Sequence, residues 1–287
     1  MNDIEFLTSN VIADAKLERN TRSCVLGGVK LGKNSLVVET GYKIEDSQAF
    51  RKKMEDHFKV PIKYLFLTHT HNDHRGGLEV YSDCDLIISK KCKENMPKRI
   101  SLKKYSKRIF EEKLVLDEEE HTIEFYRTGG HSIGHSIAYF PNEKVLFGGD
   151  LFIVGSSNFG LPFMSFYQNK PRRTGNPEEY IIAYEKFKKM PIDFIVPGHG
   201  GIVKNPDEIL DQYLEFFIAL RNHYKQAIDN GLTYEEIEYP DLELIEKAYE
   251  KARSYSPPSK AIRFLDHYLK VLKDSYYNYY CGKFHEI

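Results

Sequence analysis

The sequence lacks tryptophan, has only four cysteines and contains no long apolar run. The cysteines are scattered without a C-x-x-C pair, so we expect reduced thiols rather than a disulfide framework. No stretch approaches the roughly 18 consecutive apolar residues that a membrane-spanning helix needs. The N-terminal residues are acidic and interrupted by polar side chains, unlike a signal peptide. These absences predict a soluble, cytoplasmic protein without membrane association.

An excess of charge of either sign is also missing, because 41 Lys and Arg accompany 42 Asp and Glu. The formal net charge of −1 gives the chain as a whole no attraction to nucleic acid or to an anionic membrane. With 287 residues, 41% of them hydrophobic, the chain can bury a sizeable core as one large domain or two ordinary ones. The sequence leaves open whether it forms a homo-oligomer.

Short apolar runs alternate with a helical pattern over the first two-thirds of the chain. Strands are predicted at 35–40, 62–67, 85–89, 121–128 and 192–196, with a helix at 45–58. The segment 136–150 has the pattern of a hairpin that turns at Pro141 and Asn142. Strands interleaved with helices indicate a layered α/β architecture.

The pattern becomes helical after about Lys204. Asn205 is expected to cap a helix that has Pro206 at its first position, and Thr233–Glu236 has the sequence of a capping box. A further helix is predicted at 259–275. We therefore divide the chain into a core, 1–205, and a helical C-terminal extension, 206–287.

Histidine is sparse, with 11 in the chain, yet the segment LTHTHNDHRGG places three of them within six positions. Seven residues of metal-ligand type follow predicted strands: His69, His71, Asp73, His74, His131, Asp150 and His199. Glycines flank most of them, and glycine fits a backbone that must turn sharply beside a ligand. We expect these strand ends to converge on one site at an edge of a sheet.

Imidazole nitrogen and carboxylate oxygen suit zinc, iron or manganese, and the absence of thiolates disfavours a closed structural zinc site. Seven ligands exceed what one tetrahedral metal can use, but they fit two metals that share a carboxylate. The pattern therefore predicts two divalent metal ions as cofactors, with zinc preferred over iron or manganese.

The segments HTHNDH, TGGHSIGHS, LFGGD and VPGHG, in this order, resemble the metallo-β-lactamase-fold superfamily, an αββα sandwich with a metal site at one edge. The resemblance covers roughly residues 1–205. It implies a first metal held by His69, His71 and His131. It implies a second metal held by Asp73, His74 and His199, with Asp150 bridging the two.

Two such metals would lower the pKa of a bridging water toward neutrality and provide hydroxide at working pH. We expect this hydroxide to cleave a small ester, thioester or lactone, while Asp73 ligates a metal and orients the nucleophile. The substrate is thus predicted to be a small molecule, and Asp73 is the predicted catalytic residue.

The branch of the superfamily stays open at this point. Glyoxalase II shares the H-x-H-x-D-H-x-G-G string, but its cysteine-containing segment after the bridging aspartate has no match here. Lactonases and class B β-lactamases share the core motif, and persulfide dioxygenases use it with a single iron. A non-catalytic binding module is disfavoured because no ligand is missing.

A nuclease is a further alternative, because Ser89–Arg108 holds nine Lys or Arg against one Glu. Only Tyr105 interleaves as an aromatic residue. We favour a solvated helix balanced by the acidic run Glu118–Glu120, so nucleic acid is not the preferred partner.

The segment after Asp150 is predicted to form the substrate pocket, because it starts at the metals and loops on a rigid sheet commonly carry specificity. Aromatic side chains would cover an acyl group, and a basic cluster that includes Lys170 would meet an anionic substrate. The predicted substrate-binding residues are Phe159, Tyr167, Arg172 and Arg173. Phe163 and Phe166 fit this role and ordinary packing equally, whereas His135 is expected to be packed.

Overall fold

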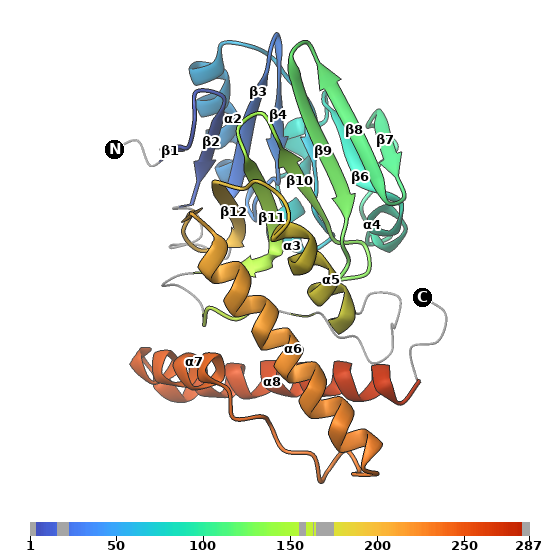
Figure 1. Cartoon of the computed structure of the whole chain (residues 1–287). Helices are drawn as coiled ribbons and strands as arrows, with labels where there is room; N and C mark the ends of the chain where they lie inside the picture. The colour runs from blue at the N-terminus through green and yellow to red at the C-terminus, as the bar shows by residue number, and fades with distance from the viewer. Residues whose placement is uncertain (1–3, 16–22, 155–158, 163, 165–174, 283–287) are drawn as a thin grey trace. The chain divides into compact units, whose positions relative to one another are not determined.

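The computed structural model describes residues 4–15, 23–154, 159–162, 164 and 175–282 (Figure 1). The chain divides into two compact units. The first comprises Met1–Thr128, Gly134–Phe152 and Pro191–Pro206, and the second comprises Gly129–Ile133, Ile153–Met190 and Asp207–Ile287. The predicted domain boundary at 205/206 stays a prediction.

The first unit contains a mixed sheet of seven strands in sequential order. They are β1 (Glu5–Phe6), β2 (Val11–Asp14), β3 (Leu26–Leu31), β4 (Asn34–Val38), β5 (Ile62–Phe66), β6 (Asp85–Ser89) and β7 (Lys107–Phe110). The pairs from β1 to β4 are antiparallel, whereas those from β4 to β7 are parallel. The carboxyl ends of β4, β5 and β6 therefore lie at the same edge of the sheet.

A second sheet has six strands in the order β13-β12-β11-β10-β9-β8. They are β8 (Lys113–Glu118), β9 (His121–Arg127), β10 (Ser136–Phe140), β11 (Val145–Ile153), β12 (Phe194–His199) and β13 (Val203–Lys204). The predicted hairpin is confirmed, because β10 and β11 pair antiparallel with Ala138 opposite Phe147. Strand β11 continues through the two glycines and Asp150 to Ile153, so Asp150 lies within a strand rather than after one.

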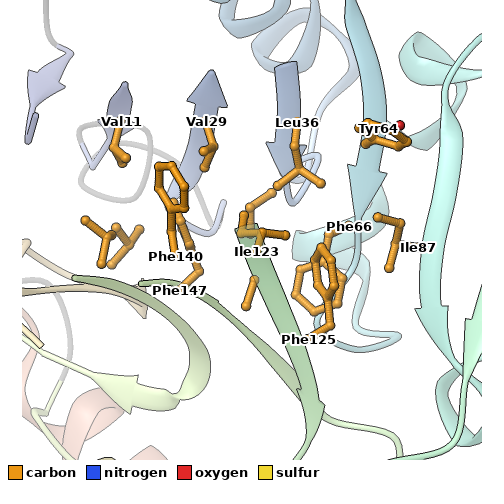
Figure 2. Close-up of a cluster of buried hydrophobic side chains, with 14 of the residues drawn as sticks. Val11, Val29, Leu36, Tyr64, Phe66, Ile87, Ile123, Phe125, Phe140 and Phe147 are labelled. Atoms are coloured by element: carbon orange, nitrogen blue, oxygen red, sulfur yellow. The ribbon is translucent and has the colours of Figure 1, made fainter. Parts of the chain in front are cut away.

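The two sheets face each other across an apolar core (Figure 2). Val11, Val29 and Leu36 of the first sheet meet Phe140 and Phe147 of the second, all with no more than 1% of their surface exposed. Farther along the core, the rings of Phe66 and Phe125 lie 4.8 Å apart. Truncating a buried phenylalanine of this kind to alanine costs about 3–5 kcal/mol. This packing holds the strand ends of both sheets in register.

Helices cover the other face of the first sheet. They are α2 (Ile44–Phe58), the 3-10 helix η1 (Leu78–Tyr81) and α4 (Lys90–Asn95), while the short helix α3 (Asn72–Arg75) follows β5. Phe50 and Met54 of α2 belong to the same buried cluster as Leu65 and Leu86 of the sheet. Two facing sheets with a helical layer confirm the predicted α/β class.

The second unit consists mainly of α5 (Pro177–Phe187), α6 (Asp207–Asp229), α7 (Glu243–Ser254) and α8 (Pro258–Tyr280). Aromatic stacking joins these helices: Tyr180 of α5 lies 4.1 Å from Phe217 of α6, and Tyr224 of α6 lies 5.2 Å from Tyr276 of α8. Within the described part of the chain, no helix combines the length and the apolar character that a membrane crossing requires.

Two sequence-based expectations about helix starts are wrong. Asn205 has a left-handed backbone (φ 52°), whereas a capping residue is extended, and α6 begins at Asp207. Thr233–Glu236 forms a turn instead of a helix start, although the Glu236 carboxylate accepts a hydrogen bond from the Thr233 backbone N–H at 2.8 Å. Pro240 follows four residues later and is incompatible with a helix continuing from that turn.

Candidate metal centre

Parallel pairing of β4 and β5 brings an acidic residue and a histidine-rich segment together. Glu39 directly follows β4, and the histidine cluster follows β5. His71 is the N-terminal flanking residue of α3, a helix of four residues that carries Asp73 and His74. His69 and His74 are fully buried. The sequence thus uses one strand end and one helical turn to direct several ligands inward.

Asp150 of β11 lies among three histidines. Its Oδ1 is 3.0 Å from Nε2 of His74 and 3.5 Å from Nε2 of His199, which ends β12. Its Oδ2 is 3.7 Å from Nε2 of His69. The two oxygens of one buried carboxylate therefore approach different imidazoles.

Asp73 is a second carboxylate that contacts His74 and His199. Its Oδ2 lies 3.2 Å from Nε2 of His199 and 3.7 Å from Nε2 of His74. The side chain of Asp73 is 28% exposed, compared with 6% for Asp150, so solvent reaches Asp73 more readily. Ligand atoms of Asp73, His74 and His199 lie within 4.8 Å of one another, a spacing that suits one metal ion.

The same spacing holds for His69, His71 and Asp150, whose ligand atoms are also within 4.8 Å of one another. Six of the seven predicted ligands are thereby brought together inside the first unit. His131 is buried in the segment Gly129–Ile133, which is grouped with the second unit, and its place among the ligands stays a prediction.

Burial and neighbouring charges shift the pKa values of Asp73, His74 and His199. Burial by itself would raise the pKa of Asp73, but the charge of His74 and a hydrogen bond from His199 lower it to about 2. Burial would lower the pKa of both histidines, yet neighbouring anionic groups hold both above the usual value. Asp150 and Asp73 act on both imidazoles. The site therefore favours cations among its carboxylates.

Gly198 makes the close packing around Asp150 sterically feasible. A Cβ atom at this position would lie 2.1 Å from Oδ1 of Asp150, much closer than any allowed contact. The glycine in the sequence VPGHG therefore leaves room for the carboxylate beside His199.

The structure also identifies residues that the sequence interpretation missed. Oε1 of Glu39 lies 3.3 Å from Nδ1 of His74 and accepts a hydrogen bond from the Thr68 backbone N–H at 3.2 Å. The Thr68 hydroxyl lies 2.9 Å from Nδ1 of His69. Both contacts involve the ring nitrogen opposite the one that approaches Asp150, and such contacts fix the orientation of a ligating imidazole. The sequence feature that could have identified Glu39 is an acidic residue placed directly after an apolar strand.

Among the remaining predicted residues, the structure describes His135 and Phe159. His135 is buried with Nδ1 3.0 Å from the Thr128 hydroxyl, and its ring centre lies 5.4 Å from that of His69. Phe159 packs against Tyr255 and Phe264, with ring centres 6.0 and 5.8 Å away. Six of the other predicted pocket residues lie outside the described residues: Phe163, Phe166, Tyr167, Lys170, Arg172 and Arg173.

All four cysteines are free, as expected. Cys24 is the one nearest the site, because its thiol interacts with His74 and its backbone N–H donates to the Asp73 carbonyl at 3.5 Å. Burial raises the pKa of Cys24 to about 11, although the charge of His74 opposes the shift. The thiol is therefore protonated at neutral pH.

Residues 25–199 match the family model of the metallo-beta-lactamase superfamily. The chain belongs to this superfamily. Metallo-beta-lactamases of known structure have a similar fold. One from Pontibacter korlensis superposes with a TM-score of 0.53 at 19% identity, covering 75% of this chain and 97% of that one. The DIM-1 metallo-beta-lactamase superposes with a TM-score of 0.57 at 17% identity, covering 75% and 96%. The αββα expectation is confirmed.

Superfamily relatives include named hydrolases. An atrochrysone carboxyl ACP thioesterase of Paecilomyces divaricatus is 24% identical over 73% of this chain and 62% of its own length. A hydroxyacylglutathione hydrolase of Pelagibacter ubique is 32% identical over 45% and 52%. A beta-lactamase-like protein 2 homolog of Caenorhabditis elegans is 27% identical over 54% and 48%. The chain thus spans about half the length of several relatives that it matches.

Proposed function

We propose that this protein is a metal-dependent hydrolase that binds two divalent metal ions and cleaves a small ester, thioester or lactone. The observation that carries the proposal is the position of Asp150. Its two oxygens approach different histidines, His69 on one side and His74 with His199 on the other. A carboxylate in this position suits a bridge between two metals.

The donor set fits such ions. Imidazole nitrogens and carboxylate oxygens are ligands that zinc, iron and manganese accept, and the described ligands meet within 4.8 Å in two groups. In the proposal, His69, His71 and His131 hold one ion, and Asp73, His74 and His199 hold the other. Asp150 contributes to both.

Metal ions bound there would supply Lewis acidity and lower the pKa of a water molecule. The chain itself contributes orientation. Asp73 is the most solvent-accessible of the carboxylates, so it is placed to accept a hydrogen bond from an attacking water and to align it. Glu39 and Thr68 keep the two buried imidazoles in fixed orientations through their Nδ1 atoms.

A thioester is the substrate class to test first. Two relatives carry names of hydrolases that act on acyl compounds, a carboxyl ACP thioesterase and a hydroxyacylglutathione hydrolase. A thioester carbonyl is a good electrophile with a leaving group that needs little protonation. The partner in this proposal is therefore a small-molecule acyl compound.

The test is metal analysis of protein purified without chelator, followed by assays on thioester, lactone, β-lactam and phosphodiester probes. We expect close to two metals per chain, thioester turnover that chelation abolishes, and recovery when zinc is restored. Asp150→Asn should lose both metal and turnover, whereas His267→Ala, an exposed histidine on α8, should retain both. A reproducible single iron with oxygen consumption on a persulfide would contradict the proposal.

A further inference from the structure

The connection between β6 and β7 is strongly basic, and its structure differs from the sequence-based expectation. Only Lys90–Asn95 forms a helix, α4, and the rest of the connection consists of turns and irregular backbone (Figure 1). Two acids of the run Glu118–Glu120, which was predicted to balance this segment, pair with other cations. Glu118 lies 3.2 Å from Lys63, and Glu119 lies 3.4 Å from Lys33, so both acids pair outside the connection.

This connection is anchored to the first unit by its apolar residues. Cys92, Met96 and Tyr105 are buried in the cluster under α2, and the Tyr105 hydroxyl donates to the Leu78 carbonyl at 2.6 Å. The Lys107 ammonium donates to the Leu102 carbonyl at 3.0 Å and to the Tyr105 carbonyl at 2.6 Å. The backbone is therefore held in place while the cationic side chains project outward.

Two of the cations at the ends of the segment have anionic partners: Lys90 lies 2.6 Å from Glu111, and Arg108 lies 3.8 Å from Asp85. Five others are exposed and make no ion pair with any residue that the structure describes. We call these five the basic surface: Lys93, Lys98, Arg99, Lys103 and Lys104. Glu94 is the one acid within the connection. The basic surface is therefore a local excess of positive charge on a chain whose net charge is −1.

We propose that the basic surface docks a carboxylate-rich surface of a partner protein. A pre-positioned set of cations attracts an anionic partner over roughly 8 Å at physiological ionic strength and raises its association rate. Single-stranded nucleic acid is less suited, because binding of bases uses exposed aromatic rings and the one aromatic residue here, Tyr105, is 3% exposed. Four of the five cations are lysines, which act as point charges rather than as phosphate-binding forks.

The experiment compares two charge-reversal variants of the full-length protein. One carries Lys98→Glu, Arg99→Glu, Lys103→Glu and Lys104→Glu. The control carries Lys59→Glu, Lys189→Glu, Arg253→Glu and Lys260→Glu, four exposed cations elsewhere for which no ion pair is described. Both variants undergo the same change in net charge. Binding to a fluorescein-labelled oligoglutamate, and to an oligouridylate of equal charge, is followed by anisotropy at several salt concentrations.

We expect the unmodified protein to bind oligoglutamate with an affinity that falls as the salt concentration rises. The basic-surface variant should lose at least about tenfold in affinity for oligoglutamate. The affinity of the control variant should stay within about twofold of that of the unmodified protein. Equal losses in both variants, or no binding by the unmodified protein, would overturn the proposal. Much tighter binding of the oligouridylate would replace the protein partner with a nucleic acid. Hydrolase activity is not part of the readout, so this test stands apart from the proposed function.

Discussion

Oε1 of Glu39 lies 3.3 Å from Nδ1 of His74, on the side of the imidazole away from Asp150. The same Glu39 oxygen accepts the backbone N–H of Thr68, the residue that precedes His69. One buried carboxylate therefore contacts His74 directly and the backbone beside His69. It links the two halves of the histidine cluster.

Replacing Glu39 with Gln should weaken metal binding by about 10–100-fold, because the partner that orients His74 loses its charge. Dissociation constants for zinc, measured by competition with a chromophoric chelator, check this expectation. Glu39→Asp keeps the charge and should recover part of the affinity. Unchanged affinity in the Gln variant would show that His74 is oriented by other contacts.

Replacing Asp73 with Ala should lower turnover by orders of magnitude while the protein stays folded. The side chain offers a ligand atom near His74 and His199, and the apolar core between the sheets, rather than this residue, contributes most to folding. Steady-state kinetics, with circular dichroism and thermal melting as the folding control, provide the measurement. Near-native activity would exclude Asp73 from the working site.

Glu118 should give the stability a pH dependence. The Tyr64 hydroxyl, the Lys63 ammonium and the Asn34 amide donate to its carboxylate and lower its pKa, and burial opposes them only in part. Because the folded-state pKa is lowered, the contribution is complete above the ordinary value of 4.5 and is lost as pH falls through the folded-state value.

Glu118→Gln should therefore destabilise the protein by about 1–3 kcal/mol at neutral pH. The difference from the unmodified protein should shrink toward zero in strong acid. Urea unfolding at a series of pH values measures this difference. A gap that stays constant down to low pH would mean that the ionised carboxylate is not what stabilises this contact.

Thiol reactivity should distinguish one cysteine from the other three. Cys281 is exposed, whereas Cys24, Cys84 and Cys92 are buried and burial raises the pKa of each thiol, to about 11 for Cys24 and about 12 for Cys84. A chromogenic disulfide should react rapidly with one thiol per native chain and with four after denaturation. Cys281→Ser should remove the rapid phase, and a second rapid thiol would contradict the burial described here.

Local sequence patterns predicted the strands that precede the ligands, because period-two and apolar runs end at glycine or at polar ligand residues. They did not predict β1, β2, β3, β7, β8 or β13. Strand β3 contains Gly27 and Gly28, which have low strand propensity, yet a Cβ on Gly27 would lie 2.4 Å from the Phe147 ring. Glycine is needed there because the opposite sheet approaches closely, and a single sequence does not report that contact.

The candidate site was predictable to the extent that its ligands lie in distinctive motifs. Glu39 was missed because its role depends on pairing between β4 and β5, which brings it to His74 across 35 positions of sequence. The solvated helix predicted at 89–108 failed for a related reason. Cys92, Met96 and Tyr105 bury into the first unit, and this tertiary packing outweighs local helix preference after Asn95.

His69 and His199 are contributed by segments 130 residues apart, one from each sheet, and Asp150 lies between them in the chain. Bringing such distant ligands together in an unfolded chain costs loop-closure entropy, which folding of the two sheets has already met. We therefore expect a metal ion to bind after the sheets have packed. Because imidazole and carboxylate ligands accept zinc, iron or manganese, we expect the ion that binds to depend on which of these is available once the chain has folded.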